Sequence, residues 1–205
     1  MNKITVIGGG AAGLMAAIAA AKNGAQVSLI EPNERLGKKI NITGKGRCNV
    51  TNDTDLEGLM AHIPRNGRFL YSALSHFTSR DTMAFFEGCG VPLKVERGDR
   101  VFPVSDSAFD ITDALKRQVK TLGIRWIHDR AASVETADGR VTAVTGEKGT
   151  YPADAVIVAT GGMSYPGTGS TAIGLPPRWA IPSWSRGARW CRWSAMTTAA
   201  AICRD

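Results

Sequence analysis

Residues 4–31 read ITVIGGGAAGLMAAIAAAKNGAQVSLIE, and this stretch decides the fold class. Residues 4–7 have the apolar, β-branched character of a buried strand, and glycines follow at positions 8, 10 and 13. The alanine-rich residues 14–22 predict a helix that ends at Gly24, and residues 26–30 predict a second strand. A strand, a glycine-rich turn, a helix and a strand in this order predict the βαβ unit of a Rossmann-type fold.

Three glycines and one acid predict a dinucleotide site within this unit. Gly8 allows a tight turn, Gly10 lets the backbone approach a pyrophosphate, and Gly13 lets the helix pack close to the strand. The N-terminus of the helix presents unpaired N–H groups to phosphates. Glu31, at the end of the second strand, can accept hydrogen bonds from ribose hydroxyls and would repel a 2′-phosphate. The alternative is a βα turn with a purely structural role.

The bulk composition argues against several classes of protein. The 205 residues carry a net charge of +7, of which residues 172–205 contribute +4. The excess of basic over acidic residues therefore lies largely in the C-terminal segment, and it is weak evidence for a nucleic-acid partner. No run approaches the ~20 apolar residues of a membrane span. The four cysteines lack CxxC spacing, so neither a disulfide framework nor a metal site is predicted, and we expect a cytoplasmic protein.

A second glycine-rich segment, residues 37–52, reads GKKINITGKGRCNVTN. It combines many backbone N–H groups with basic side chains at positions 38, 39, 45 and 47, which suits a diphosphate. The alternative is a solvated surface loop. The segment follows directly after Glu31, the expected ribose-binding acid, and this position favours a diphosphate-binding role over a surface loop.

The remaining elements predict a helical region followed by a return to the sheet. Residues 56–90 predict helices with their aromatic residues in the core, and Ser79 is the expected N-cap of the last of these helices. Residues 91–96 and 100–104 predict one hairpin, and residues 131–136 and 140–146 predict another across Asp138-Gly139. A helix from Ser107 or Asp110 to residue 122 leads into a parallel strand at 124–128. Residues 155–159 predict a returning central strand that ends in a tight glycine turn.

Three of these stretches carry a family resemblance. The GxGxxG turn with Glu31, TGKGRCNVTN at 43–52 and ATGGMSYPGTGST at 159–171 resemble flavoproteins of the glutathione-reductase type, which have two dinucleotide-binding folds. More narrowly, they resemble the family called BaiN-like, aminoacetone-oxidase-like or NAD(P)/FAD-dependent oxidoreductases. The resemblance covers residues 1 to about 171. It implies an α/β, Rossmann-like FAD/NAD(P)-binding three-layer fold with a parallel central sheet, a β-hairpin crossover and a helical insertion at about 53–105.

The resemblance also implies FAD as the cofactor, with NAD(P)H as a candidate electron donor and a small organic molecule as the substrate. From the charge distribution and the lack of a long apolar run we expect no nucleic-acid or membrane partner, and no side chain is assigned a catalytic role. A reactive thiol at Cys48 is conceivable in a cationic loop, but a structural role is favoured. The implied contacts are Gly8, Gly10, Ala12 and Gly13 at the pyrophosphate; Glu31 at the ribose; Lys39, Gly46, Arg47, Cys48 and Asn49 along the diphosphate and the approach to the flavin; Val134 at the adenine; and Thr160, Gly161 and Gly162 along the cofactor.

Residues 172–205 depart from the family pattern. They hold four of the five tryptophans and five arginines, without a helical or strand period. Their composition is typical of GC-rich coding sequence read out of frame, so we expect a frameshift-derived tail on an incomplete FAD-binding domain, 1–171. The rival interpretation is a tail that binds nucleic acid or an anionic membrane. A chain of this kind should hold FAD weakly and turn over little. The alternatives are an NAD-dependent dehydrogenase and a nucleotide-binding module without catalysis.

Overall fold

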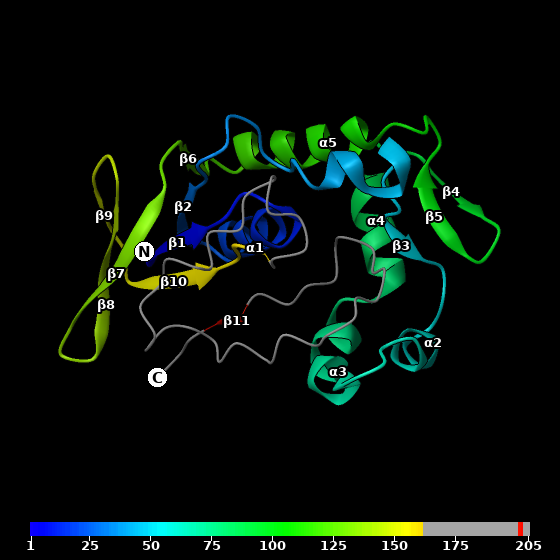
Figure 1. Cartoon of the computed structure of the whole chain (residues 1–205), viewed down its shortest axis with the longest axis horizontal. Coiled ribbons are helices and arrows are strands. Elements are labelled where there is room, and N and C mark those ends of the chain that lie inside the picture. The colour runs from blue at the N-terminus through cyan, green and yellow to red at the C-terminus, as the bar shows by residue number, and fades with distance from the viewer. Residues whose placement is uncertain (162–200, 203–205) are drawn as a thin grey trace. The chain divides into compact units, whose positions relative to one another are not determined.

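A computed structural model of the chain describes residues 1–161 and 201–202, which fall into two compact units (Figure 1). Of the described residues, unit 1 comprises 1–38, 116–161 and 201–202, and unit 2 comprises 39–115. Unit 2 therefore contains the region expected to be a helical insertion, residues 53–105.

Unit 1 holds most of the strands and the glycine-rich helix. Its elements are β1 (Lys3–Ile7), α1 (Ala11–Lys22), β2 (Gln26–Ile30), the second half of α5 (Ala108–Thr121), β6 (Arg125–Ile127), β7 (Ala131–Ala137), β8 (Arg140–Gly146), β9 (Thr150–Pro152), β10 (Ala155–Val158) and β11 (Ala201–Ile202). Unit 2 holds η1 (Ile40–Gly46), β3 (Thr51–Asn52), α2 (Leu56–Ala61), α3 (Gly67–His76), α4 (Ser79–Gly88), β4 (Leu93–Glu96), β5 (Arg100–Pro103) and the first half of α5.

The central sheet of unit 1 has the strand order β11-β10-β1-β2-β6. The four strands β10, β1, β2 and β6 run parallel, and β11 pairs antiparallel with β10. Val6 pairs with Leu29 of β2 and Ile157 of β10, and all three side chains are buried. Helix α1 packs against β1, β2 and β10 through Leu14 and Ile18. The expected parallel sheet is confirmed, including the strand predicted at 124–128.

A second sheet, β7-β8-β9, is an antiparallel meander in the same unit. Asp138 and Gly139 both have left-handed φ values, 51° and 77°, as a two-residue turn of type I′ requires. The expected hairpin is therefore confirmed, and β9 adds a third strand to it. Val134 and Val144 pack in one buried cluster with Ile7 of β1 and other apolar residues of the parallel sheet. The meander thus covers the parallel sheet at the ends of β1 and β2.

Unit 2 combines helices α2 to α4 with the small antiparallel sheet β3-β5-β4. The expected hairpin is confirmed as β4 and β5, and Phe86 and Phe102 are buried side chains of this unit. The expectation that Ser79 is the N-cap of α4 is wrong, because Thr78 occupies that position. Asp81 N–H donates to the Thr78 hydroxyl, and Thr78 N–H donates to the Asp81 carboxylate at 2.8 Å. Ser79 instead begins the helix, and its hydroxyl pairs with buried Thr51 at 3.0 Å.

The aromatic side chains of α3 are more exposed than the sequence pattern predicts. Leu74 is buried, whereas Phe69 is 82% exposed and Tyr71 is 55% exposed. Leu70 and Leu74 share one helical face at i, i+4; Leu70 is half-buried and Leu74 is the buried residue of the helix. The expectation that these aromatics belong to the core is wrong for Phe69 and Tyr71.

Candidate cofactor site

Two glycines of the first motif are required by the fold of unit 1 itself. Gly8 has φ +108°, and its N–H donates to the Ile30 carbonyl at 2.8 Å. A Cβ atom at Gly8 would collide with the Ala159 carbonyl, and a Cβ atom at Gly13 would collide with the Gly8 carbonyl. The first turn of α1 therefore packs directly on the end of β1, as the motif predicts.

Gly10 is different, because nothing in the described part of the chain requires a glycine there. Its backbone has φ −80° and ψ −172°, which any residue can adopt, and a Cβ atom would meet no atom of the described residues within 4 Å. It is the N-cap of α1 without a side-chain capping hydrogen bond, and the first turn of the helix, which includes Ala12, holds no acid. The N–H groups of a 12-residue helix thus face an open cradle, and this arrangement fits a pyrophosphate.

Glu31 lies at the edge of this cradle and is 7% exposed. Its Oε2 accepts a hydrogen bond from Gly9 N–H at 2.6 Å. Its Oε1 accepts from the Asn33 N–H at 2.9 Å and from the Asn33 side-chain amide. Each carboxylate oxygen can accept two hydrogen bonds, so Oε2 can still accept one from a ribose hydroxyl. Sequence reasoning missed Gly9 and Asn33; an Asn two residues after an acid, suited to a local turn, was the available signal.

The end of β10 completes the site in unit 1. Ala159 N–H donates to the Ile7 carbonyl at 2.8 Å, and Gly161 has φ +78°. The Thr160 Cα lies beside the Gly8 turn. Val134, expected at the adenine, has its side chain buried in the cluster beneath the ends of β1 and β2. These residues gather at the carboxyl ends of parallel strands, where open α/β sheets bind ligands. Gly162 lies outside the described residues.

The remaining expected residues lie in unit 2, in and around the loop that follows η1. Lys39 is the N-cap residue of η1, and Gly46 has φ +87°. Asn49, with its amide oriented by its hydrogen bonds, donates to the Thr51 carbonyl at 2.9 Å and the Val101 carbonyl at 3.2 Å. It therefore ties the loop to strands β3 and β5.

Cys48 is fully buried in this loop and has φ +59°. Burial raises the pKa of its thiol to about 11, against a smaller lowering by its hydrogen bond with Thr43. A thiol with this pKa stays protonated at neutral pH and is a poor nucleophile. The structure therefore favours a structural role for the Cys48 side chain over a reactive one.

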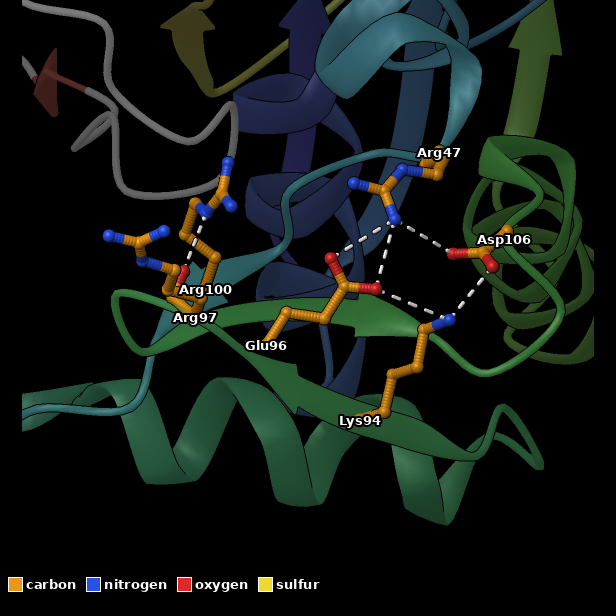
Figure 2. A network of polar contacts seen from close by, with 6 residues as sticks. All are labelled: Arg47, Lys94, Glu96, Arg97, Arg100 and Asp106. Atoms are coloured by element: carbon orange, nitrogen blue, oxygen red, sulfur yellow. Dashed lines mark hydrogen bonds and ion pairs between the residues drawn. The ribbon is translucent and has the colours of Figure 1, made fainter.

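Arg47 is held by two carboxylates of the same unit (Figure 2). Its Nη1 donates to Glu96 at 2.9 and 3.1 Å and to Asp106 at 3.2 Å. Its guanidinium carbon lies 4.1 Å from the centroid of the Phe102 ring, which is a cation–π contact. Lys94 bridges the same carboxylates, 2.8 Å from Asp106 and 3.3 Å from Glu96. The hydrogen bond from Lys94, with that from Arg47, holds the pKa of Asp106 below its usual range despite partial desolvation.

These partners of Arg47 could not be found from the sequence. Glu96 and Asp106 lie 49 and 59 positions after Arg47, and neither belongs to a glycine-rich motif. Within the described residues, no group of three His, Cys, Asp or Glu side chains could hold a metal ion. None of the described helices has the length and apolar character that a bilayer crossing requires.

Comparison with known proteins places the chain in a family. The family model described as "HI0933-like protein Rossmann domain" matches residues 2–180. The chain is 36% identical over 178 residues to the 3-dehydro-bile acid delta(4,6)-reductase of Clostridium scindens, covering 85% of this chain and 42% of that protein. It is 33% identical over 184 residues to the ribosomal RNA dihydrouridine synthase of Haemophilus influenzae, covering 86% and 45%. The chain thus spans less than half the length of these relatives.

Solved structures show the same fold at low sequence identity. A flavocytochrome c3 fumarate reductase has a TM-score of 0.61 at 24% identity, covering 78% of this chain and 34% of that one. The 3-ketosteroid-delta4-(5alpha)-dehydrogenase of Rhodococcus jostii has a TM-score of 0.58 at 18% identity, covering 78% and 46%. The expected Rossmann-like α/β fold and the expected family resemblance are both confirmed. The chain belongs to the family of the HI0933-like Rossmann domain.

Proposed function

We propose that this chain is the FAD-binding portion of an FAD-dependent oxidoreductase. The observation that carries the proposal is the open cradle at Gly10, where the uncapped N-terminus of α1 meets a buried acid. Neither the backbone conformation of Gly10 nor the packing around it requires a glycine. A ligand that approaches the backbone closely at this position would explain why a glycine stands there. The names of the curated relatives, a reductase and a dihydrouridine synthase, support oxidoreductase chemistry.

The residues of unit 1 would hold the adenosine diphosphate half of the cofactor. The N–H groups of the first turn of α1, with Ala12, would donate to the pyrophosphate beside Gly10. Glu31 would accept a hydrogen bond from the ribose while it keeps its bond to Gly9 N–H. The backbone of β7 near Val134 would lie at the adenine, and the turn at Thr160 and Gly161 would follow the cofactor.

In unit 2, Gly46 at the end of η1 and the loop residues Arg47 and Asn49 would contribute N–H groups and a positive charge toward the diphosphate. Cys48 would contribute through its backbone, because its side chain is fully buried. Lys39 would add a second cation. When bound, FAD supplies hydride-transfer chemistry, and the role of the chain is to bind and orient it. NAD(P)H is the proposed electron donor.

The proposed substrate is a small organic molecule, as the name of the bile-acid reductase suggests. A nucleobase in RNA is a second candidate, because relatives at 33% and 31% identity are named as ribosomal RNA dihydrouridine synthases. The expectation of no nucleic-acid partner gains no support from these relatives. A steroid-like enone and a uridine-containing RNA hairpin, each supplied with NADPH and FAD, separate the two candidates by which one is reduced.

Flavin absorbance and NADH oxidation test the proposal directly. The purified chain should bind FAD in preference to NAD⁺ and should bind it weakly, because it spans less than half the length of the relatives it matches. An NAD-dependent dehydrogenase would instead bind NAD⁺ more tightly than FAD. A nucleotide-binding module without catalysis would bind FAD but show no NADH oxidation after FAD is added. Tighter binding of NAD⁺ than of FAD would overturn the proposed function.

A further inference from the structure

Four charged side chains of unit 2 form a closed ring, the Arg47 ring (Figure 2). Arg47 contacts Glu96 and Asp106, and Lys94 contacts the same two acids, so cations and anions alternate. The ring joins three segments that are distant in sequence: the loop after η1, strand β4 and the turn before α5. The Asp106 backbone is itself left-handed, with φ +56°.

Among the described residues, the geometry of the ring leaves part of the Arg47 guanidinium available to a ligand. Both acids contact the same nitrogen, Nη1, and the flat face of the group lies on Phe102. In Figure 2 the other terminal nitrogen of Arg47 points away from Asp106, and no dashed line joins it to either carboxylate. A guanidinium carries five N–H donors in a rigid fork, so fixing one nitrogen fixes the direction of the others.

The ring is also too exposed to be explained as a stabilising ion pair alone. The four side chains are between 28% and 44% exposed, and ion pairs at such positions contribute little to stability singly. A long side chain binds an anion more tightly when its neighbours already hold it in the binding orientation. The entropy cost of ordering the side chain is then not subtracted from the binding free energy.

We propose that Glu96 and Asp106 are positioning residues, which hold Arg47 so that its outer N–H groups meet a phosphate of the cofactor in a fixed orientation. This inference rests on the proposed function, in which the loop after η1 lies at the diphosphate of FAD. The competing possibility is that the two acids act as rival anions, which occupy Arg47 and weaken phosphate binding. The two possibilities predict opposite signs for the loss of an acid.

A double-mutant cycle on FAD affinity tests this proposal in the full 205-residue chain. Glu96→Ala should weaken FAD binding about threefold to tenfold, the amount expected from one side chain that must be ordered on binding. In an Arg47→Ala background the same substitution should have almost no further effect. Glu96→Gln, which keeps an oxygen acceptor for Nη1, should recover part of the affinity. Glu147→Ala removes a more exposed acid, 63% against 28% for Glu96, that pairs with Arg130 in unit 1, and it should leave FAD binding unchanged.

A second readout does not depend on FAD. Because Arg47 is followed by fully buried Cys48, loosening the ring should speed alkylation of Cys48 by iodoacetamide, with Cys89 as the internal reference in mass spectra. Tighter FAD binding by Glu96→Ala, equal weakening in both backgrounds, or unchanged Cys48 labelling would overturn the positioning role. A wild-type chain that shows no FAD binding at all would overturn the proposed function, and this inference with it.

Discussion

The Glu31 carboxylate accepts a hydrogen bond from Gly9 N–H at 2.6 Å, so the acid at the end of β2 holds the glycine turn at the end of β1. One side chain therefore links the two halves of the cradle before any ligand is present. The same carboxylate is the group proposed to select the ribose. The selectivity of the site for its nucleotide and the shape of the turn should consequently change together when Glu31 is altered.

Glu31→Gln should weaken ADP binding about tenfold, because hydrogen bonds to a charged acceptor are stronger than those to a neutral one. It should also reduce the preference for ADP over ADP with a 2′-phosphate, since the repelling charge is gone. Isothermal titration with the two nucleotides measures both effects. An unchanged preference would show that Glu31 does not face the ribose.

Gly13→Ala should destabilise unit 1 strongly, because the added methyl group would collide with the Gly8 carbonyl. Overpacking of this kind typically costs about 1–3 kcal/mol, and here the neighbour is backbone, which yields little. Gly88→Ala is the matched control: it lies in α4 with open space around the added atom, and it should stabilise the helix by up to about 1 kcal/mol. Urea denaturation of both variants compares them, and equal midpoints would contradict the close packing at Gly13.

Asp129 makes the stability of the chain dependent on pH in the acid range. Burial by itself would raise the pKa of Asp129, but the Tyr151 hydroxyl at 2.7 Å and the N–H groups of Lys148 and Arg130 outweigh it and hold that pKa below its usual range. A carboxyl whose folded pKa is lowered stabilises the fold above the unfolded pKa, which is about 3.9, and this stabilisation is lost as pH falls toward the folded value.

Tyr151→Phe removes the strongest of these hydrogen bonds, so the loss of stability on acidification should become shallower. Urea midpoints at pH 7, 5 and 3.5 give the slope for each protein. A steeper acid slope in the variant than in the wild type would contradict the assignment to Asp129.

Cys48→Ala should leave FAD affinity within about twofold of the wild type. The Cys48 thiol is buried and stays protonated, so the residue would contact the cofactor only through its backbone, which the substitution keeps. The variant should lose some stability, since a buried sulfur is replaced by a smaller group. Flavin fluorescence quenching measures the affinity. A loss of FAD binding without a loss of thermal stability would show that the thiol itself contacts the cofactor.

The part of the site in unit 1 could be predicted because its determinants are contiguous. Gly8, Gly13 and Glu31 lie within one βαβ unit, where local sequence dictates both the turn and the packing. Gly9 and Asn33 were missed because their role depends on where the Glu31 side chain turns. The Arg47 ring could not be predicted, since its members meet only after β4, β5 and the loop after η1 have packed together.

The exposure of α3 shows another limit of sequence patterns. Phe69 and Tyr71 are apolar enough to suggest a core, but two leucines of the same short helix already occupy its inner face. Hydrophobic type alone does not decide which of several apolar residues a small unit can bury. Thr78 was similarly overlooked as an N-cap, although Asp81 three residues later completes a capping box with it.

The most direct test of the account is FAD titration of the wild-type chain beside Gly10→Leu and Gly88→Leu. Gly10 has no structural need to be glycine, so Gly10→Leu should fold as the wild type does and fill the cradle with its side chain. Gly88 has the same open surroundings in unit 2 and serves as the control. The account predicts that FAD binding is lost in Gly10→Leu and kept in Gly88→Leu, with both proteins folded. Unchanged FAD affinity in a folded Gly10→Leu would contradict it.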